Sequence, residues 1–199
     1  MNHLVKQTVR RNFIKVFLLC SMLCLLCSVN LFAGNPVSVK SGSGSVLKQS
    51  SKALLEIDYS ATKVGDQTLE EYLQGRGEDF VRDWPQDKET AASYFKKYFN
   101  KKNKGMKLTT DVAEASHKIV IHVNKLDMGN AGGVFYSSVF APKAGGCSMI
   151  GTIDVIDMSS NETACVLYVD EVQGVSVLSE TLRLGLMYNE LAVRICKLK

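Results

Sequence analysis

The C-terminal part of the chain constrains the fold most, because two apolar strands around a polar turn lead into a long apolar helix. Ile153 and Val155 alternate with polar residues before the turn, which is the period of a half-buried strand. Cys165, Leu167 and Val169 alternate in the same way after the turn. These residues predict an antiparallel hairpin with one face in the core.

The helix expected over 178–197 is apolar around most of its circumference. Its polar side chains form one narrow stripe: Arg183, Glu190, Arg194 and Lys197. A helix of this kind must be buried on more than one side. Ser176 or Ser179 can cap its first turn, and Gly185 is expected to let the helix backbone approach the sheet closely.

The first 33 residues have the composition of an export signal. Four basic residues and no acid precede an apolar run over 16–27, and Ala33 is a small residue at the expected cleavage position before Gly34. We therefore expect a signal peptide and a periplasmic, outer-membrane-associated or secreted protein. An uncleaved anchor stays open, because the apolar residues are just numerous enough to span a membrane. Arg10-Arg11 resembles a twin-arginine signal, whereas the leucine-rich run favours the general secretory route.

The rest of the chain is expected to form a flexible tether over 34–51, rich in Ser and Gly, and a single domain over 52–199. The leader carries four of the chain's 24 Lys and Arg residues and none of its 20 acids. The remainder is therefore balanced in charge, which argues against a nucleic-acid partner.

Three cysteines lie outside the leader, and none is in a CxxC or metal-ligand spacing: Cys147, Cys165 and Cys196. The spacing supports neither redox chemistry nor a metal, and we expect no cofactor. We expect no obligatory disulfide, because a domain of this size has core enough without one. One disulfide with one free thiol stays open.

Earlier segments supply the other elements of the fold. A strand is expected over 53–64, a short helix opens at the Thr68–Glu71 capping box, a second helix covers 87–101, and another strand covers 117–124. Aromatic residues at helical spacing in the second helix predict a core face. This order predicts an α+β, two-layer sandwich with a mixed or antiparallel sheet of about four to five strands, helices mainly on one face and a long C-terminal helix.

The segment 129–147 contains five glycines around an apolar middle. Long loops in compact domains are usually functional or mobile, so an exposed apolar middle predicts contact with a partner protein. The residues concerned are Val134, Phe135, Tyr136, Val139 and Phe140. An additional edge strand with glycine hinges stays open as an alternative. A phosphate loop is excluded by the absence of a Gly-Lys-Ser/Thr motif.

A run of lysines without acids follows the second expected helix: Lys96, Lys97, Lys101, Lys102, Lys104 and Lys107. Cations are favoured at a helix C-terminus, and a solvated helix end explains the run. The alternative is a patch that contacts an anionic surface, such as an envelope polymer or lipid head groups.

The remaining polar residues predict no catalytic or metal-binding site. His117 and His122 are five residues apart in a strand, so they point to opposite faces and cannot share a metal. The clustered carboxylates are expected to be outward-facing strand residues rather than a paired acid and base. They are Asp154, Asp157, Asp170 and Glu171.

The segment from Ile150 to Ile195 carries a resemblance to known proteins. It has the pattern I-x-V-x-D before the turn, V-x-x-V-x-G after it and a closing helix rich in Leu and Ala. This pattern resembles the α/β domains of cell-envelope proteins related to the TolB N-terminal domain and the curli secretion protein CsgG, and uncharacterised exported proteins of Bacteroidetes-type bacteria. The resemblance implies an assembly or adaptor domain without catalytic residues. The leader cysteines each follow a leucine, so the chain lacks the lipobox of lipidated members.

Three functions follow as expectations. The first is an exported, non-enzymatic cell-envelope domain that binds envelope proteins as an adaptor, through 129–147 or through a sheet edge. The second is a small-ligand-binding or hydrolytic periplasmic protein with a pocket near the same segment. The third is an anionic-surface binder that uses the lysine run, with strong salt dependence.

Overall fold

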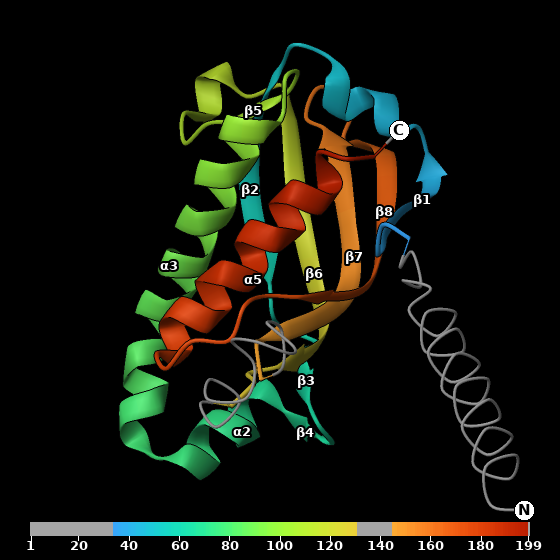
Figure 1. Ribbon diagram of the computed structural model, residues 1–199. Helices are drawn as coiled ribbons and strands as arrows, with labels where there is room; N and C mark the ends of the chain where they lie inside the picture. Colours follow the sequence, from blue (N-terminus) through green and yellow to red (C-terminus); the bar gives the residue numbers. More distant parts are fainter. Residues whose placement is uncertain (1–33, 131–144, 199) are drawn as a thin grey trace, which may run out of the picture. The chain divides into compact units, whose positions relative to one another are not determined.

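A computed structural model describes residues 34–130 and 145–198 (Figure 1). Its mixed sheet has eight strands in the order β1-β8-β7-β6-β2-β5, with β3 and β4 attached at β6. The strands are β1 (Val37–Gly42), β2 (Lys52–Asp58), β3 (Lys63–Val64), β4 (Gln67–Thr68), β5 (Lys107–Leu108), β6 (His117–Asp127), β7 (Ser148–Asp157) and β8 (Glu162–Gln173). β1, β8, β7 and β6 are antiparallel in succession, whereas β2 is parallel to both β6 and β5.

The helices of the described ranges are α2 (Leu69–Arg76), α3 (Glu78–Lys102) and α5 (Glu180–Ile195), with short 3-10 turns η1 (Gly44–Lys48) and η2 (Val112–Glu114). In Figure 1, α3 and α5 lie side by side over one face of the sheet. None of these helices is long and apolar enough to cross a membrane.

The core lies between these two helices and the sheet. Phe95 and Phe99 of α3 are fully buried and stack at 5.7 Å between ring centroids. On the opposite side of the core lie alternate residues of β6, β7 and β8, such as Ile121, Ile153 and Leu167. The alternation read from the sequence therefore places the core face of the hairpin and the aromatic face of α3 correctly.

The predicted α+β class, mixed sheet and C-terminal helix are confirmed, but four to five strands were too few. β3, β4 and β5 have two residues each, so they are too short to show an alternating pattern. The helix caps predicted from residues close in the chain are confirmed. Thr68 and Glu71 form the expected capping box, and Ser179 accepts a hydrogen bond from the Leu182 N–H as the cap of α5.

The tether expected over 34–51 is replaced by ordered structure. β1 pairs with β8 along the edge of the sheet, and η1 buries Val46 and Leu47. The compact unit accordingly begins at Asn35. The sequence did not indicate this strand because its few apolar residues stand among serines and glycines. Its hydrogen bonds come from β8, which lies far away in the sequence.

Two expectations for α5 were wrong. Arg183 is only 4% exposed and so does not belong to a solvated polar stripe. Gly185 faces α3 rather than the sheet, because a Cβ added there would lie 2.9 Å from the ring of Tyr94. The missing side chain therefore brings the two helices together.

Candidate partner-binding groove

The outer edge of β2 is open beyond its second residue. β5 pairs only with Lys52 and Ala53, and the Ala53 carbonyl accepts a hydrogen bond from Thr109 N at 2.9 Å. Since backbone groups alternate in direction along a strand, the N–H and C=O of Leu55 and Ile57 point to this same outer side. Within the described residues no strand pairs with them there.

Helix α3 runs beside this open edge (Figure 1). Between them lies a cavity of about 700 Å³ that we call the edge groove. Its walls include Leu54 to Glu56 on β2 and Ala92 and Lys96 on α3. The carboxylate of Glu56 is 2.5 Å from the Lys118 ammonium, so one charge on this edge is already neutralised. The groove is therefore largely apolar along an unpaired strand.

A second cavity, of about 460 Å³, lies where the chain leaves β2. We call it the aromatic cavity, because Tyr59 and Trp84 form part of its wall with their rings edge to face at 5.2 Å. The Tyr59 hydroxyl is fixed by Tyr188 of α5 at 2.7 Å. Both cavities thus lie between β2 or its continuation and helix α3.

A polar cluster lies on the sheet face turned away from the helices. The His122 Nδ1 atom is 3.0 Å from Asp58 Oδ2, and its Nε2 atom is 3.4 Å from Asp154 Oδ2. The three residues come from β2, β6 and β7, which are neighbours in the sheet. A neutral imidazole can donate from one nitrogen only, whereas a protonated one donates to both carboxylates. The cluster therefore joins three neighbouring strands.

Asp58 makes this cluster sensitive to acid. Hydrogen bonds from Ser60 and His122 lower the pKa of Asp58 from 3.8 to about 2. Ionised Asp58 therefore stabilises the fold above its unfolded pKa, and that contribution is lost as the pH falls from 3.8 towards 2. We expect the difference in unfolding free energy between the wild type and Asp58→Asn to be constant above about pH 5 and to shrink below it.

Urea unfolding at a series of pH values measures this difference. The variant Ser60→Ala removes the largest cause of the lowered pKa of Asp58. The pH range over which ionised Asp58 loses its stabilising effect should therefore become narrower. A difference that stays the same down to about pH 2 would contradict the assignment.

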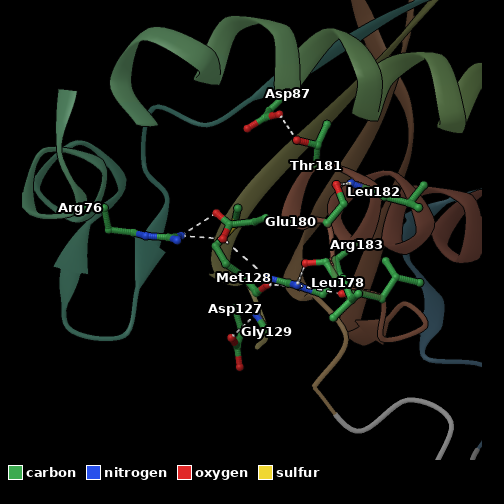
Figure 2. Close-up of polar contacts among 12 residues, drawn as sticks. Arg76, Asp87, Asp127, Met128, Gly129, Leu178, Glu180, Thr181, Leu182 and Arg183 are labelled. Carbon is green, nitrogen blue, oxygen red and sulfur yellow. Dashed lines mark hydrogen bonds and ion pairs between the residues drawn. The ribbon is translucent and has the colours of Figure 1, made fainter. Parts of the chain in front are cut away.

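A buried arginine organises the start of α5 (Figure 2). Arg183 donates from Nε to the Met128 carbonyl at 3.1 Å and from Nη1 to the Val177 and Leu178 carbonyls at 2.8 and 2.9 Å. Its Nη2 atom lies 3.6 Å from the Glu180 carboxylate. One side chain thus holds the residues after β6 and the link before α5 in place.

Two other contacts extend this cluster to the neighbouring helices (Figure 2). Arg76 at the end of α2 contacts Glu180 at 2.6 Å, and Thr181 donates to Asp87 of α3 at 2.6 Å. The guanidinium of Arg76 also stacks over the Phe80 ring at 3.8 Å. The first turn of α5 is therefore tied to α2, α3 and the end of β6. We interpret this cluster as structural.

The lysine run is divided by the fold. The Lys107 ammonium donates to the carbonyls of Asn100 and Asn103, so it caps the end of α3. Lys96 lines the edge groove. The solvent-exposed members are Lys97, Lys101, Lys102 and Lys104. Contact with an anionic surface stays a prediction that rests on these four side chains.

The apolar residues proposed for partner contact lie outside the described residues: Val134, Phe135, Tyr136, Val139 and Phe140. Beside the ends of that segment is a polar cavity of about 320 Å³ lined by Asp127, Ser148 and Glu171. Ser148 donates to Glu171 at 3.1 Å. A ligand site there stays a prediction.

The cysteines give no sign of reactivity. Cys147, Cys165 and Cys196 are all free. Burial raises the pKa of Cys147, and it raises that of Cys196 to about 11, so these thiols stay protonated at neutral pH. Within the described ranges, no group of three or more His, Cys, Asp and Glu side chains is arranged to hold a metal ion.

The sequence interpretation missed the open edge, the aromatic cavity and the Asp58–His122–Asp154 cluster. His117 bonds Ser116 and points away from His122, as expected from their odd spacing. The partners of His122 lie on two other strands, so the neighbours along the chain gave no signal. Asp154 was expected to face outward, and it does so opposite Val166 of β8.

Comparisons with known proteins give a distant similarity in fold. No protein family matches the chain, and no curated protein matches it significantly. The PelC dodecamer from Paraburkholderia phytofirmans has a similar structure, with a TM-score of 0.40 and 12% identity over 78% of this chain and 96% of that one. A variant of the same protein gives a TM-score of 0.39 and 12% identity over 82% and 97%. Similarity at this level carries no inference about function or assembly.

Proposed function

We propose that this protein is an exported, non-enzymatic cell-envelope domain that binds an extended segment of a partner protein at the outer edge of β2. The observation that carries the proposal is that, in the part of the chain the structure describes, no strand pairs with the outer backbone groups of Leu55 and Ile57 beside the edge groove. A strand added there would satisfy these groups and continue the line of β5. Addition of a strand to an exposed sheet edge is a general mode of peptide recognition.

The composition of this edge supports binding rather than protection. Proteins usually blunt an edge strand with outward charges, Pro or a covering element. In β2 beyond Ala53, Leu54, Leu55 and Ile57 are half-buried, and the exposed acid Glu56 is paired with Lys118. The adjacent wall of α3 supplies Ala92 and the stem of Lys96. A partner segment with apolar side chains would therefore fit this edge.

Amide hydrogen exchange by NMR tests whether the edge is open. In the free protein the amides of Leu55 and Ile57 should exchange faster than those of Leu54 and Glu56, whose N–H groups face β6. A bound partner segment should protect Leu55 and Ile57 and leave their neighbours unchanged. Equal protection of all four amides in the free protein would overturn the proposal.

Partner binding in the cell is tested by photo-crosslinking from a reactive residue placed at Ser93, on the α3 wall of the edge groove. Ala92→Arg should fill the groove and abolish the crosslinked species. Gln86→Arg adds the same charge at an exposed position of α3 that does not line the groove, so it should keep that species. Loss of crosslinking in both variants, or in neither, would contradict binding in the groove.

A further inference from the structure

The aromatic cavity has the size and lining of a small-molecule site. Its volume of about 460 Å³ falls within the usual range for ligand pockets. Leu69 and Leu73 of α2 and Trp84 of α3 are buried and give it an apolar wall. Tyr59 completes that wall, and burial raises the pKa of its phenol, so the ring stays uncharged at neutral pH.

Among the described residues that line this cavity, the carboxylate of Glu70 is the one charged group, and none is a cation. Glu70 Oε1 accepts a hydrogen bond from Gln74 Nε2 at 3.1 Å, one turn further along α2. The amide thus orients the carboxylate and leaves Oε2 and the Gln74 oxygen as acceptors. A ligand that pairs with the exposed carboxylate of Glu70 would bring positive charge and hydrogen-bond donors.

The other polar groups of the lining are already engaged. Thr68 and Glu71 bond each other in the capping box. The Thr62 hydroxyl is buried and donates to the Val123 carbonyl at 2.7 Å. Ser60 bonds Asp58. Apart from the second N–H of Gln74, the cavity therefore offers a ligand hydrogen-bond acceptors.

We propose that the aromatic cavity binds an organic cation, a protonated primary amine on an apolar stem. The ammonium would donate to Glu70 and Gln74, while the stem lies against Leu73, Trp84 and Tyr59. Aromatic rings beside the ammonium add cation–π attraction. This chemistry is shared by a free small amine and by a lysine side chain of a bound protein. The site does not depend on strand addition at the edge groove.

Trp84 provides a direct readout, because it is the single tryptophan of the chain. The test titrates the purified protein with 2-phenylethylamine and with its neutral counterpart 2-phenylethanol, excited at the red edge of tryptophan absorption. We expect a saturable change in Trp84 emission with the amine and at least about tenfold weaker binding of the alcohol. No saturable change, or equal affinity for the two compounds, would overturn the proposal.

Glu70→Gln should lower the affinity for the amine by about tenfold to a hundredfold and leave the alcohol unaffected. Glu78→Gln removes the same charge from an exposed position close by that does not line the cavity, so it should bind like the wild type. Amine binding that is unchanged in Glu70→Gln, or equally weakened in both variants, would contradict the assignment. If Glu70→Gln lowered the melting temperature, the comparison of amine and alcohol binding to the wild type would still test whether the cavity prefers a cation.

A competing peptide distinguishes the two sources of the cation. An acetylated peptide with one lysine between leucines should displace 2-phenylethylamine if the site serves a protein side chain, and an acetyl-lysine version should not. Displacement by neither peptide assigns the site to free amines. Ala92→Arg should leave amine binding intact, and Glu70→Gln should leave the amide hydrogen exchange of β2 unchanged. Failure of the amine-site proposal can therefore be told apart from failure of the strand-addition proposal.

Discussion

Replacing Arg183 by methionine is expected to lower the free energy of unfolding by about 3 kcal/mol, because the carbonyls that this buried side chain bonds lose their donor. The side chain is 4% exposed and bonds the carbonyls of Met128, Val177 and Leu178. Methionine has a similar length but no donor, so these acceptors lose their partner. Urea unfolding followed by circular dichroism measures the difference.

Arg194→Met is the matched control on the same helix. Arg194 pairs with Glu190 at 2.7 Å, and both side chains are about a quarter exposed, at 26% and 25%. An i, i+4 pair of this kind contributes about 0.3–0.5 kcal/mol, so the control should lose less than about 1 kcal/mol. Equal losses in the two variants would show that the Arg183 cluster does not organise the fold.

Gly151→Ala is expected to lower the free energy of unfolding by about 3 kcal/mol, at the upper end of the range for overpacking. A Cβ at Gly151 would lie 2.1 Å from the carbonyl oxygen of His122. That oxygen belongs to the neighbouring strand β6, so relief of the clash requires a shift of the backbone rather than of a side chain. The pairing of β7 with both neighbours is irregular beside this glycine, as expected where a glycine marks a bulge.

Gly75→Ala provides the opposite result for the same chemical change. Gly75 lies in the last turn of α2, and a Cβ there meets no atom within 4 Å. Alanine should stabilise the helix by about 0.5–1 kcal/mol, because it restricts the unfolded chain. Thermal unfolding of the two variants side by side separates a steric clash from a general effect of replacing glycine. A destabilised Gly75→Ala together with an unaffected Gly151→Ala would refute this explanation.

Local patterns predicted the parts of the fold that depend on residues close in the chain. The hairpin of β7 and β8, the capping box at Thr68 and the Ser179 cap of α5 belong to this group. Helical periodicity placed Arg183 on a polar stripe, yet its partners come from β6 and from the link before α5. A helical wheel contains no information about those partners, so the burial of this charge was missed.

The candidate sites depend on strand order, which the sequence did not reveal. The edge of β2 is open because β5 ends after two residues, and a pairing of that length leaves no recognisable pattern. Asp58 and His122 are brought together by a parallel pair whose members lie 64 residues apart. Side-chain pairs of this kind can be predicted only when the order of neighbouring strands is known.

The pairing of β1 with β8 also determines when the sheet can be completed during folding. β1 begins at Val37, close to the start of the compact unit, whereas β8 is the last strand before α5. β1 therefore cannot pair until the chain as far as β8 is available, whether it emerges from a ribosome or is threaded across a membrane. Until then β1 keeps an unpaired backbone, whereas β2 can already pair with β5 and β6, so the edge strand at β8 is the last part of the sheet to form.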